Sequence, residues 1–235
     1  MKKTISILLG SSALILASAS YASDVKFADP APNKGIGYEW TVNIGNTSVD
    51  PVTKATRKYE VAEFTGAVGA KSKYEPSFTA PNFGWTHTSD WVALNVTADS
   101  FVTIEVARQQ GVTGYSVDAT TKAVTDTTAL DMLYPGISVY QNWEENAATV
   151  ESHDFNPMGT PSWTNDLKYI DVAYADQGQA TISYSIVLAK GKYSLNIGGV
   201  NALWCKATDP CYLGDHGYRA KITSTPLVKM YFPGG

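Results

Sequence analysis

The chain has 235 residues, of which 44% are hydrophobic, and a formal net charge of −4 at neutral pH. This weak acidic charge argues against nucleic acid and anionic membrane surfaces as partners. The length is sufficient to bury one sizeable core, and β-rich chains of this size are often single domains.

The first residues have the three parts of a secretory signal peptide. Lys2 and Lys3 form a basic start, and the apolar stretch 5–17 is shorter than a typical spanning helix. Ser20 and Ala22 are small residues at the positions that signal peptidase reads. We therefore expect cleavage after Ala22, with an uncleaved N-terminal anchor as the alternative.

The sequence after this leader predicts one exported domain. We expect residues 1–22 to be a signal peptide, residues 23–37 to be a loosely ordered arm, and residues 38–235 to be a single domain. Without the leader, 16 basic and 22 acidic side chains remain, and no further segment is apolar enough to span a bilayer. The expected location is the cell surface with the outer membrane, the medium, or the periplasm.

Strand patterns dominate the chain. In 101–108, Val102, Ile104 and Val106 alternate with more polar positions, as in a strand with one buried face. A short helix is predicted only for 125–133, and the longest irregular stretch is 144–170. Other strand-like runs are 38–44, 58–64, 91–98, 135–143, 179–189, 192–199 and 218–227. These patterns predict an all-β fold, an antiparallel two-sheet β-sandwich with long irregular loops.

Two cysteines, Cys205 and Cys211, lie close together in the sequence. In an exported protein, such a pair favours a disulfide over a thiolate metal site. If bridged, these sulfur atoms are excluded as metal ligands.

A tryptophan and two histidines are the residues most suggestive of a metal site. In an extended segment, Trp85 and His87 of "WTH" would project from the same side of the strand. His153 follows 66 residues later in the irregular stretch, within "SHD". Two imidazoles with a weak third group suit monovalent copper, although a core tryptophan and a surface histidine are also compatible with this pattern.

An exported β-rich chain with Trp-x-His and a later lone His resembles the CorA/MopE group, the copper-repressible surface proteins of methane-oxidising bacteria. The resemblance covers roughly residues 83–227. It implies that one copper ion is held by His87, His153 and Trp85, with Trp85 oxidised to kynurenine. It further implies copper acquisition at the surface or in the medium, delivery to an envelope receptor or partner protein, and an additional calcium ion.

Weaker ligand candidates lie in the same irregular stretch. Met158 offers a soft thioether to copper, or simply fills a gap in a loop. Asp166 and Asp171 are the calcium candidates, because Ca²⁺ takes six to eight oxygen ligands. Asn165, Glu144 and Glu145 could add oxygen atoms, and solvated loop side chains are the alternative.

No nucleophile, zinc-protease or phosphate-loop motif is present, so we expect a copper-binding protein rather than an enzyme. The alternative function is a carbohydrate- or surface-binding module. In that case Trp91, Trp143 and Trp163 would form the platform on which sugar rings stack. Copper analysis separates the two functions.

Overall fold

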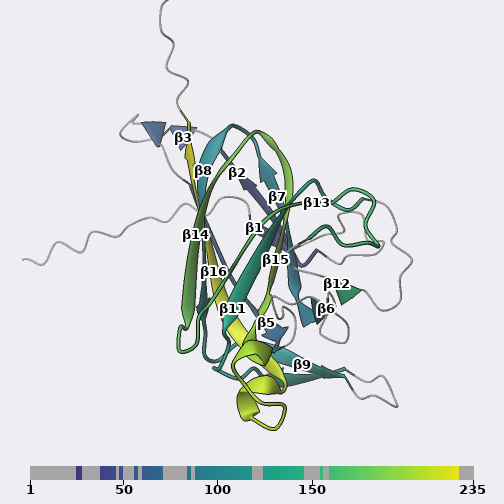
Figure 1. Ribbon diagram of the computed structural model, residues 1–235. Helices are drawn as coiled ribbons and strands as arrows, with labels where there is room; N and C mark the ends of the chain where they lie inside the picture. Colours follow the sequence, from purple (N-terminus) through teal and green to yellow (C-terminus); the bar gives the residue numbers. More distant parts are fainter. Residues whose placement is uncertain are drawn as a thin grey trace, which may run out of the picture.

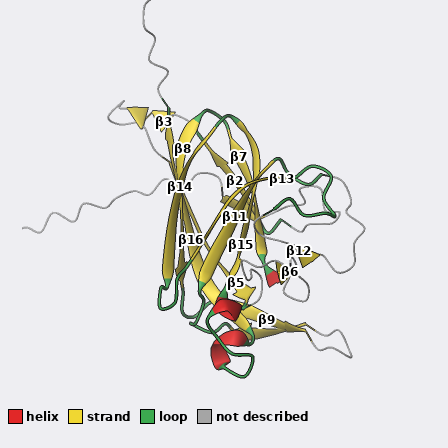
Figure 2. Ribbon diagram, in the orientation of Figure 1, coloured by secondary structure: helices red, strands yellow, loops and turns green. Residues whose placement is uncertain are grey.

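The computed structural model describes residues 25–27, 38–45, 48–49, 56–57, 60–70, 84–85, 88–117, 124–145, 154–155 and 159–227. Two β-sheets face each other in this part of the chain, so the predicted β-sandwich is confirmed (Figure 1). The helical turns here are short and lie at one end of the sandwich (Figure 2). None of the helices within these ranges has the length and apolar character needed to cross a membrane.

One sheet has six strands and is antiparallel except at one pair. In pairing order it contains β1 (Val25–Phe27), β2 (Trp40–Ile44), β7 (Asp90–Val96), β15 (Gly191–Gly199), β11 (Pro135–Gln141) and β13 (Lys168–Tyr174). The exception is the parallel pair β2 and β7. Part of the predicted N-terminal arm is therefore strand β1, whose Val25 pairs with Val42 of β2.

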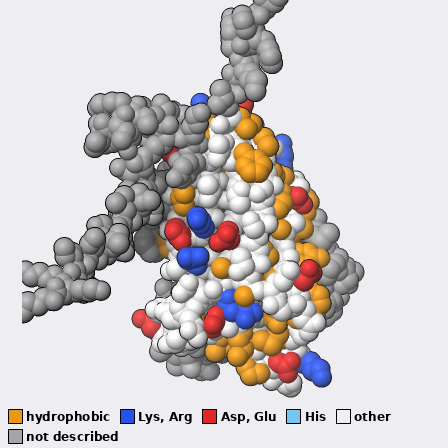
Figure 3. Space-filling view, turned by 90° about the vertical axis from the view of Figure 1, so that its left-hand side faces the viewer, with side chains coloured by type: hydrophobic (Ala, Val, Ile, Leu, Met, Phe, Trp, Pro, Cys, Tyr) orange, Lys and Arg blue, Asp and Glu red, His pale blue; other side chains and the backbone are white. Residues whose placement is uncertain are grey.

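The other sheet has four strands, all antiparallel. Its order is β14 (Thr181–Leu188), β8 (Ser100–Arg108), β16 (Asp215–Pro226) and β5 (Glu60–Gly69). In β8 the alternation is as predicted, because Val102, Ile104 and Val106 have no exposed surface while Phe101 is 45% exposed. Basic and acidic side chains are interspersed over the side of the molecule on which β14 and β8 lie (Figure 3).

Three two-stranded ladders connect segments outside the main sheets. They are β3 (Ser48–Val49) with β4 (Thr56–Arg57), β9 (Thr113–Val117) with β10 (Val124–Thr128), and β6 (Gly84–Trp85) with β12 (Asp154–Phe155). The helix predicted for 125–133 is wrong, because its first half is strand β10. Thr125 and Thr127 are β-branched residues, and they pair with Ser116 and Gly114 of β9.

The main core fills the space between the two sheets with aliphatic and aromatic side chains from both. Full burial of each such side chain contributes about 1.5–3 kcal/mol to folding. Its fully buried members include Val42, Leu94, Ile104, Ile137, Leu195 and Ile222.

A second apolar cluster covers the opposite face of the six-stranded sheet. It contains Tyr38, Trp91, Ala93, Tyr140, Trp163 and Leu167. Trp163 and Leu167 come from the connection between β11 and β13, so this connection is packed against the sheet at its β13 end. The Tyr38 hydroxyl bonds the Ser194 hydroxyl at 2.7 Å and accepts a hydrogen bond from the Glu144 N–H at 2.8 Å. These bonds fasten the β11 end of the same connection.

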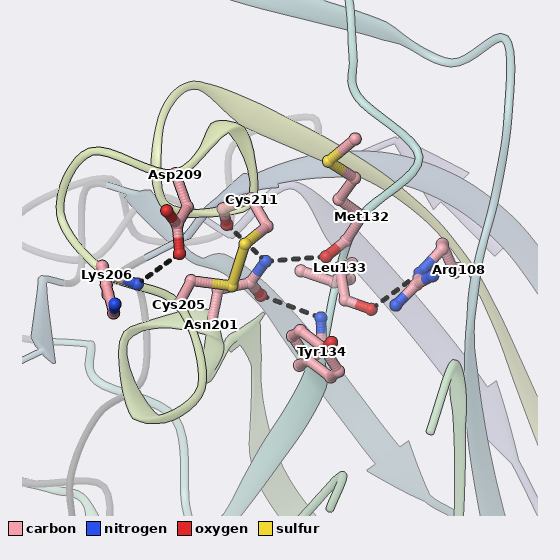
Figure 4. Close-up of a disulfide and its surroundings, with 9 residues drawn as sticks. All are labelled: Arg108, Met132, Leu133, Tyr134, Asn201, Cys205, Lys206, Asp209 and Cys211. Carbon is pink, nitrogen blue, oxygen red and sulfur yellow. Dashed lines mark hydrogen bonds between the residues drawn. A yellow bond between two sulfur atoms is a disulfide. The ribbon is translucent and has the colours of Figure 1, made fainter. Parts of the chain in front are cut away.

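The predicted disulfide between Cys205 and Cys211 is confirmed. It joins the turn that follows η2 (Asn201–Leu203) to η3 (Pro210–Tyr212). Asn201 beside it is fully buried and bonds three backbone groups, those of Tyr134, Met132 and Cys211, at 2.7–2.8 Å (Figure 4).

Candidate metal centre

A short ladder joins the two segments that carry the predicted copper ligands. β6 and β12 pair antiparallel, with Trp85 opposite Asp154 and Gly84 opposite Phe155. These pairs bridge a sequence separation of about seventy residues, so the contact is a product of the tertiary fold. Trp85 belongs to the "WTH" motif, and Asp154 is the last residue of "SHD".

The chain that follows "WTH" is held against the end of β5 before it enters β7. A Cβ added to Gly69 would lie only 2.8 Å from the Cβ of Thr88, so the glycine allows this close approach. Ser89 is 4% exposed, and Trp91 is buried two residues later. The segment after the motif is therefore fixed by packing at the edge of the sandwich.

Of the predicted copper ligands, only the backbone of Trp85 is described. His87, His153 and Met158 lie outside the described residues, as does the predicted signal peptide, 1–22. The assignment of these side chains to copper remains a prediction. Elsewhere in the described chain, no group of three or more His, Cys, Asp or Glu side chains is arranged to hold a metal ion.

The two candidate calcium ligands lie in different elements: Asp166 is in the loop before β13, and Asp171 is in β13. The Asp171 carboxylate, in β13, accepts hydrogen bonds from the Tyr184 hydroxyl at 2.7 Å and from the Val172 N–H at 2.8 Å. Asp166 lies before β13 and accepts from the Glu145 N–H at 3.4 Å. Calcium binding by these residues also remains a prediction.

Glu144 was a further candidate oxygen ligand for calcium, but its carboxylate stabilises the loop before β13 through hydrogen bonds. Its side chain is fully buried, and its carboxylate accepts from the N–H groups of Asn165 and Asp166 at 2.9 and 3.2 Å. A buried carboxylate needs such partners, because desolvating an unpaired charge is costly.

Burial excludes two of the three tryptophans suggested for a sugar platform. Trp91 is 1% exposed and Trp163 is 8% exposed, so neither offers a ring face to solvent. Trp143 is partly exposed, but its indole N–H bonds the Tyr193 carbonyl at 3.0 Å. The Lys192 ammonium also lies 4.6 Å from the Trp143 ring centre, over one face. The predicted platform of three tryptophans is therefore wrong.

Two carboxyl groups that the sequence analysis did not single out lie together beside the start of β7. The Tyr218 hydroxyl donates to Asp90 at 2.6 Å, and the Trp91 N–H donates to Glu39. The pKa of Asp90 is raised by burial, with the charge of Asp215 adding to the effect and the bond from Tyr218 opposing it. The pKa of Glu39 is raised by burial of its carboxyl end and by Asp90.

The third histidine, His216 in β16, is fully buried in the described structure. Neither ring nitrogen has a hydrogen bond of ordinary geometry. Burial, and then the charge of Arg108, lower its pKa to about 4, while a backbone contact with Leu213 acts in the opposite direction. His216 is therefore neutral at physiological pH and inaccessible to solvent.

No protein-family model and no curated protein sequence matches this chain. Among solved structures it is similar to CorA, a surface-associated copper-binding protein important in copper acquisition in Methylomicrobium album BG8. That likeness has 16% identity and a TM-score of 0.46, over 70% of this chain and 93% of CorA. A second is the secreted protein MopE of Methylococcus capsulatus, in which an oxidized tryptophan facilitates copper binding. Here identity is 14% and the TM-score 0.40, over 83% of this chain and 99% of that one.

A third similar structure is the pre-peptidase C-terminal domain of a collagenase from Bacillus anthracis. It has 12% identity and a TM-score of 0.31, over 77% of this chain and 93% of that one. At these identities and TM-scores, the similarities indicate only a distant relationship of fold, and they assign no function.

Proposed function

We propose that the protein captures one copper ion, as Cu(I), through His87, His153 and Trp85 or its oxidised product, for copper acquisition outside the cytoplasm. The observation that carries this proposal is the pairing of Trp85 with Asp154 across β6 and β12. The motif residues come from distant parts of the sequence, and a shared site requires the fold to bring these parts together.

Covalent geometry limits how far apart the two histidines can be. His153 directly precedes Asp154, and His87 follows Trp85 by two residues. With about 3.8 Å between consecutive Cα atoms and about 5 Å across a strand pair, the two histidine Cα atoms lie at most about 17 Å apart. A twelve-residue strand such as β16 spans about 40 Å. The pairing thus supports a common site, since opposite ends of the sandwich are beyond this limit.

The donor set explains the choice of metal. Imidazole and soft ligands suit copper, and two imidazoles with one weak third group satisfy the low coordination of Cu(I). An intact indole offers only an N–H donor and its π-face. Ring opening of Trp85 by dioxygen, followed by hydrolysis that releases formate, would leave an aromatic amine and a ketone as ligands. Copper binding should weaken as pH falls, because the imidazoles must be neutral to bind.

The test is copper affinity measured on the full exported chain by competition with a Cu(I) chelator. His87→Ala and His153→Ala should each weaken binding by at least about tenfold, as the loss of one of few ligands requires. His216→Leu is the matched control, because this histidine is buried elsewhere and should leave the affinity unchanged. Unchanged affinity in both His87→Ala and His153→Ala would refute the proposed site.

Oxidation of Trp85 has a separate readout. Intact mass of protein from its natural source should show the loss of one carbon and the gain of one oxygen, and Trp85→Phe should remove this change. Trp204→Phe serves as the control, because Trp204 is 36% exposed and lies outside the proposed site, so this variant should keep the mass change. A natural protein with unmodified mass that still binds copper would leave the histidines as ligands and exclude kynurenine.

A further inference from the structure

A pocket of about 620 Å³, lined in part by two carboxyl groups, lies beside the start of β7. Small-molecule sites are typically clefts of a few hundred to about a thousand cubic ångströms. The residues around it come from both sheets and from the turn between β8 and β9. They include Glu39, Asp90, Trp40, Thr65, Gln109 and Val112.

Two features shape the floor of this pocket. The Asp90 carboxylate and the Tyr218 hydroxyl lie directly under Gly66 of β5. A Cβ on Gly66 would meet them at 2.4 and 2.6 Å. The absence of a side chain at Gly66 therefore lets the Asp90 carboxylate and the Tyr218 hydroxyl lie close against β5, where a Cβ would displace them.

The two ionisable side chains among the described lining residues are both acidic. Glu39 and Asp90 supply two carboxyl groups, and no basic residue is among the described residues that line it. Arg108 precedes the lining residue Gln109, but its guanidinium bonds the Leu133 carbonyl at 3.0 Å and lies over the Tyr134 ring. The two carboxyl groups therefore have no partner cation among the described lining side chains, which accords with the raised pKa values of both, about 8 for Glu39 and about 7 for Asp90.

We propose that this pocket binds a small organic cation, with an ammonium or guanidinium head group at Glu39 and Asp90. The apolar stem of such a ligand would lie along Val112 and Trp40, while Thr65 and Gln109 offer polar contacts at the sides. A charge-assisted hydrogen bond to each carboxyl group, once ionised, would pair it with the positive head group of the ligand. This inference does not rest on the copper site, and copper loading is not its readout.

Proton linkage gives the site a distinctive signature. Both carboxyl pKa values are raised by burial, and for Glu39 also by Asp90, while Asp215 and Tyr218 face Asp90 from β16. A bound cation favours the ionised forms. Binding at neutral pH should therefore release protons, and affinity should rise as pH increases from about 5 to 8.

The experiment titrates cadaverine and agmatine into copper-free protein by calorimetry, with pentanediol as the neutral analogue of cadaverine. Saturable binding at or below about 1 mM is expected for the cations and none for the diol. Glu39→Gln should weaken binding by at least about tenfold. Glu63→Gln, at an exposed carboxylate paired with Arg219 on the outer face, should not change it.

A further variant avoids the risk that Asp90→Asn unfolds the protein. Thr65→Lys would place a tethered ammonium at the pocket and should exclude both probes without removing a carboxylate. No binding of either cation at about 10 mM, equal binding of the diol, or equal affinity in Glu39→Gln would each overturn the proposal. It would also fail if Ca²⁺ bound at these carboxylates and the amines could not displace it.

Discussion

The buried imidazole of His216 should make the fold sensitive to acid. Its pKa is lowered from an ordinary value of about 6.5 to about 4, first by burial and then by Arg108. As pH falls below about 6.5 the unfolded chain takes up a proton and the folded chain does not. Stability is therefore fully present above this pH and is lost progressively down to about pH 4. A pKa shift of this size corresponds to a loss of folding stability of at most about 3 kcal/mol. The folding stability of a typical protein is roughly 5–15 kcal/mol, so this loss would be a large share of it.

The assay is urea unfolding of the wild type and of His216→Leu at pH 7 and pH 4.5. At pH 7 the two proteins should agree within about 1 kcal/mol, because removing an unbonded polar group from the core costs little. At pH 4.5 the wild type should have lost about 2–3 kcal/mol more than the variant. Glu39 and Asp90, whose raised pKa values act in the opposite direction, are present in both proteins and cancel. Equal losses would show that the folded protein accommodates the imidazolium, and the reasoning would be wrong.

Three further changes test how the fold is held. Replacing Cys205 and Cys211 by Ser should lower the free energy of unfolding, measured with urea, by about 2 kcal/mol relative to the oxidised wild type, as expected for a short closed loop. The reduced wild type, which lacks the same bridge, should match the variant. Asn201→Ala should cost about 2–4 kcal/mol, because three backbone groups lose their partner; a loss below 1 kcal/mol would mean that water replaces the amide. Gly66→Ala should lower the thermal midpoint by several degrees, since the new Cβ meets a carboxylate oxygen at 2.4 Å. Gly191→Ala, whose Cβ has no neighbour closer than 3.6 Å, should leave the midpoint nearly unchanged, and equal effects would contradict the steric argument.

The sandwich was predictable because its strands carry a local signal. A run such as Val102, Ile104 and Val106 needs only period-two alternation to identify its buried face. The segment 125–133 failed because β10 depends on pairing with β9, and the apolar residues that suggested a helix lie after the strand ends. Local propensity was overridden there by a contact that a single sequence does not display.

Burial outside the main core was harder to predict. Trp91 and Trp163 have the residue type of a binding platform, yet both are buried in the second cluster, where Trp163 of the connection from β11 to β13 packs on the six-stranded sheet. Glu144 has the residue type of a solvated acid, yet it is buried beneath backbone N–H groups. Residue type alone does not show which sheet face a loop will cover.

The candidate metal centre was predicted from a motif and its spacing, whereas the structure contributes the pairing of Trp85 with Asp154. No local signal links residues separated by so much chain. The carboxyl pair of Glu39 and Asp90 was missed for the same reason, since the two residues approach only through the parallel pairing of β2 and β7. Tertiary neighbours of this kind need the fold before they can be recognised.

The connection between β11 and β13 is held at both ends, by the hydrogen bonds of Glu144 at one end and by the packing of Trp163 and Leu167 at the other. The chain between these contacts joins two points that are already fixed. Doubling the length of such a segment costs only about 0.6 kcal/mol of closure entropy. Insertions and deletions in this connection should therefore change the folding free energy little, provided that β12 is kept, because losing β12 would remove the pairing with β6 on which the proposed copper site depends.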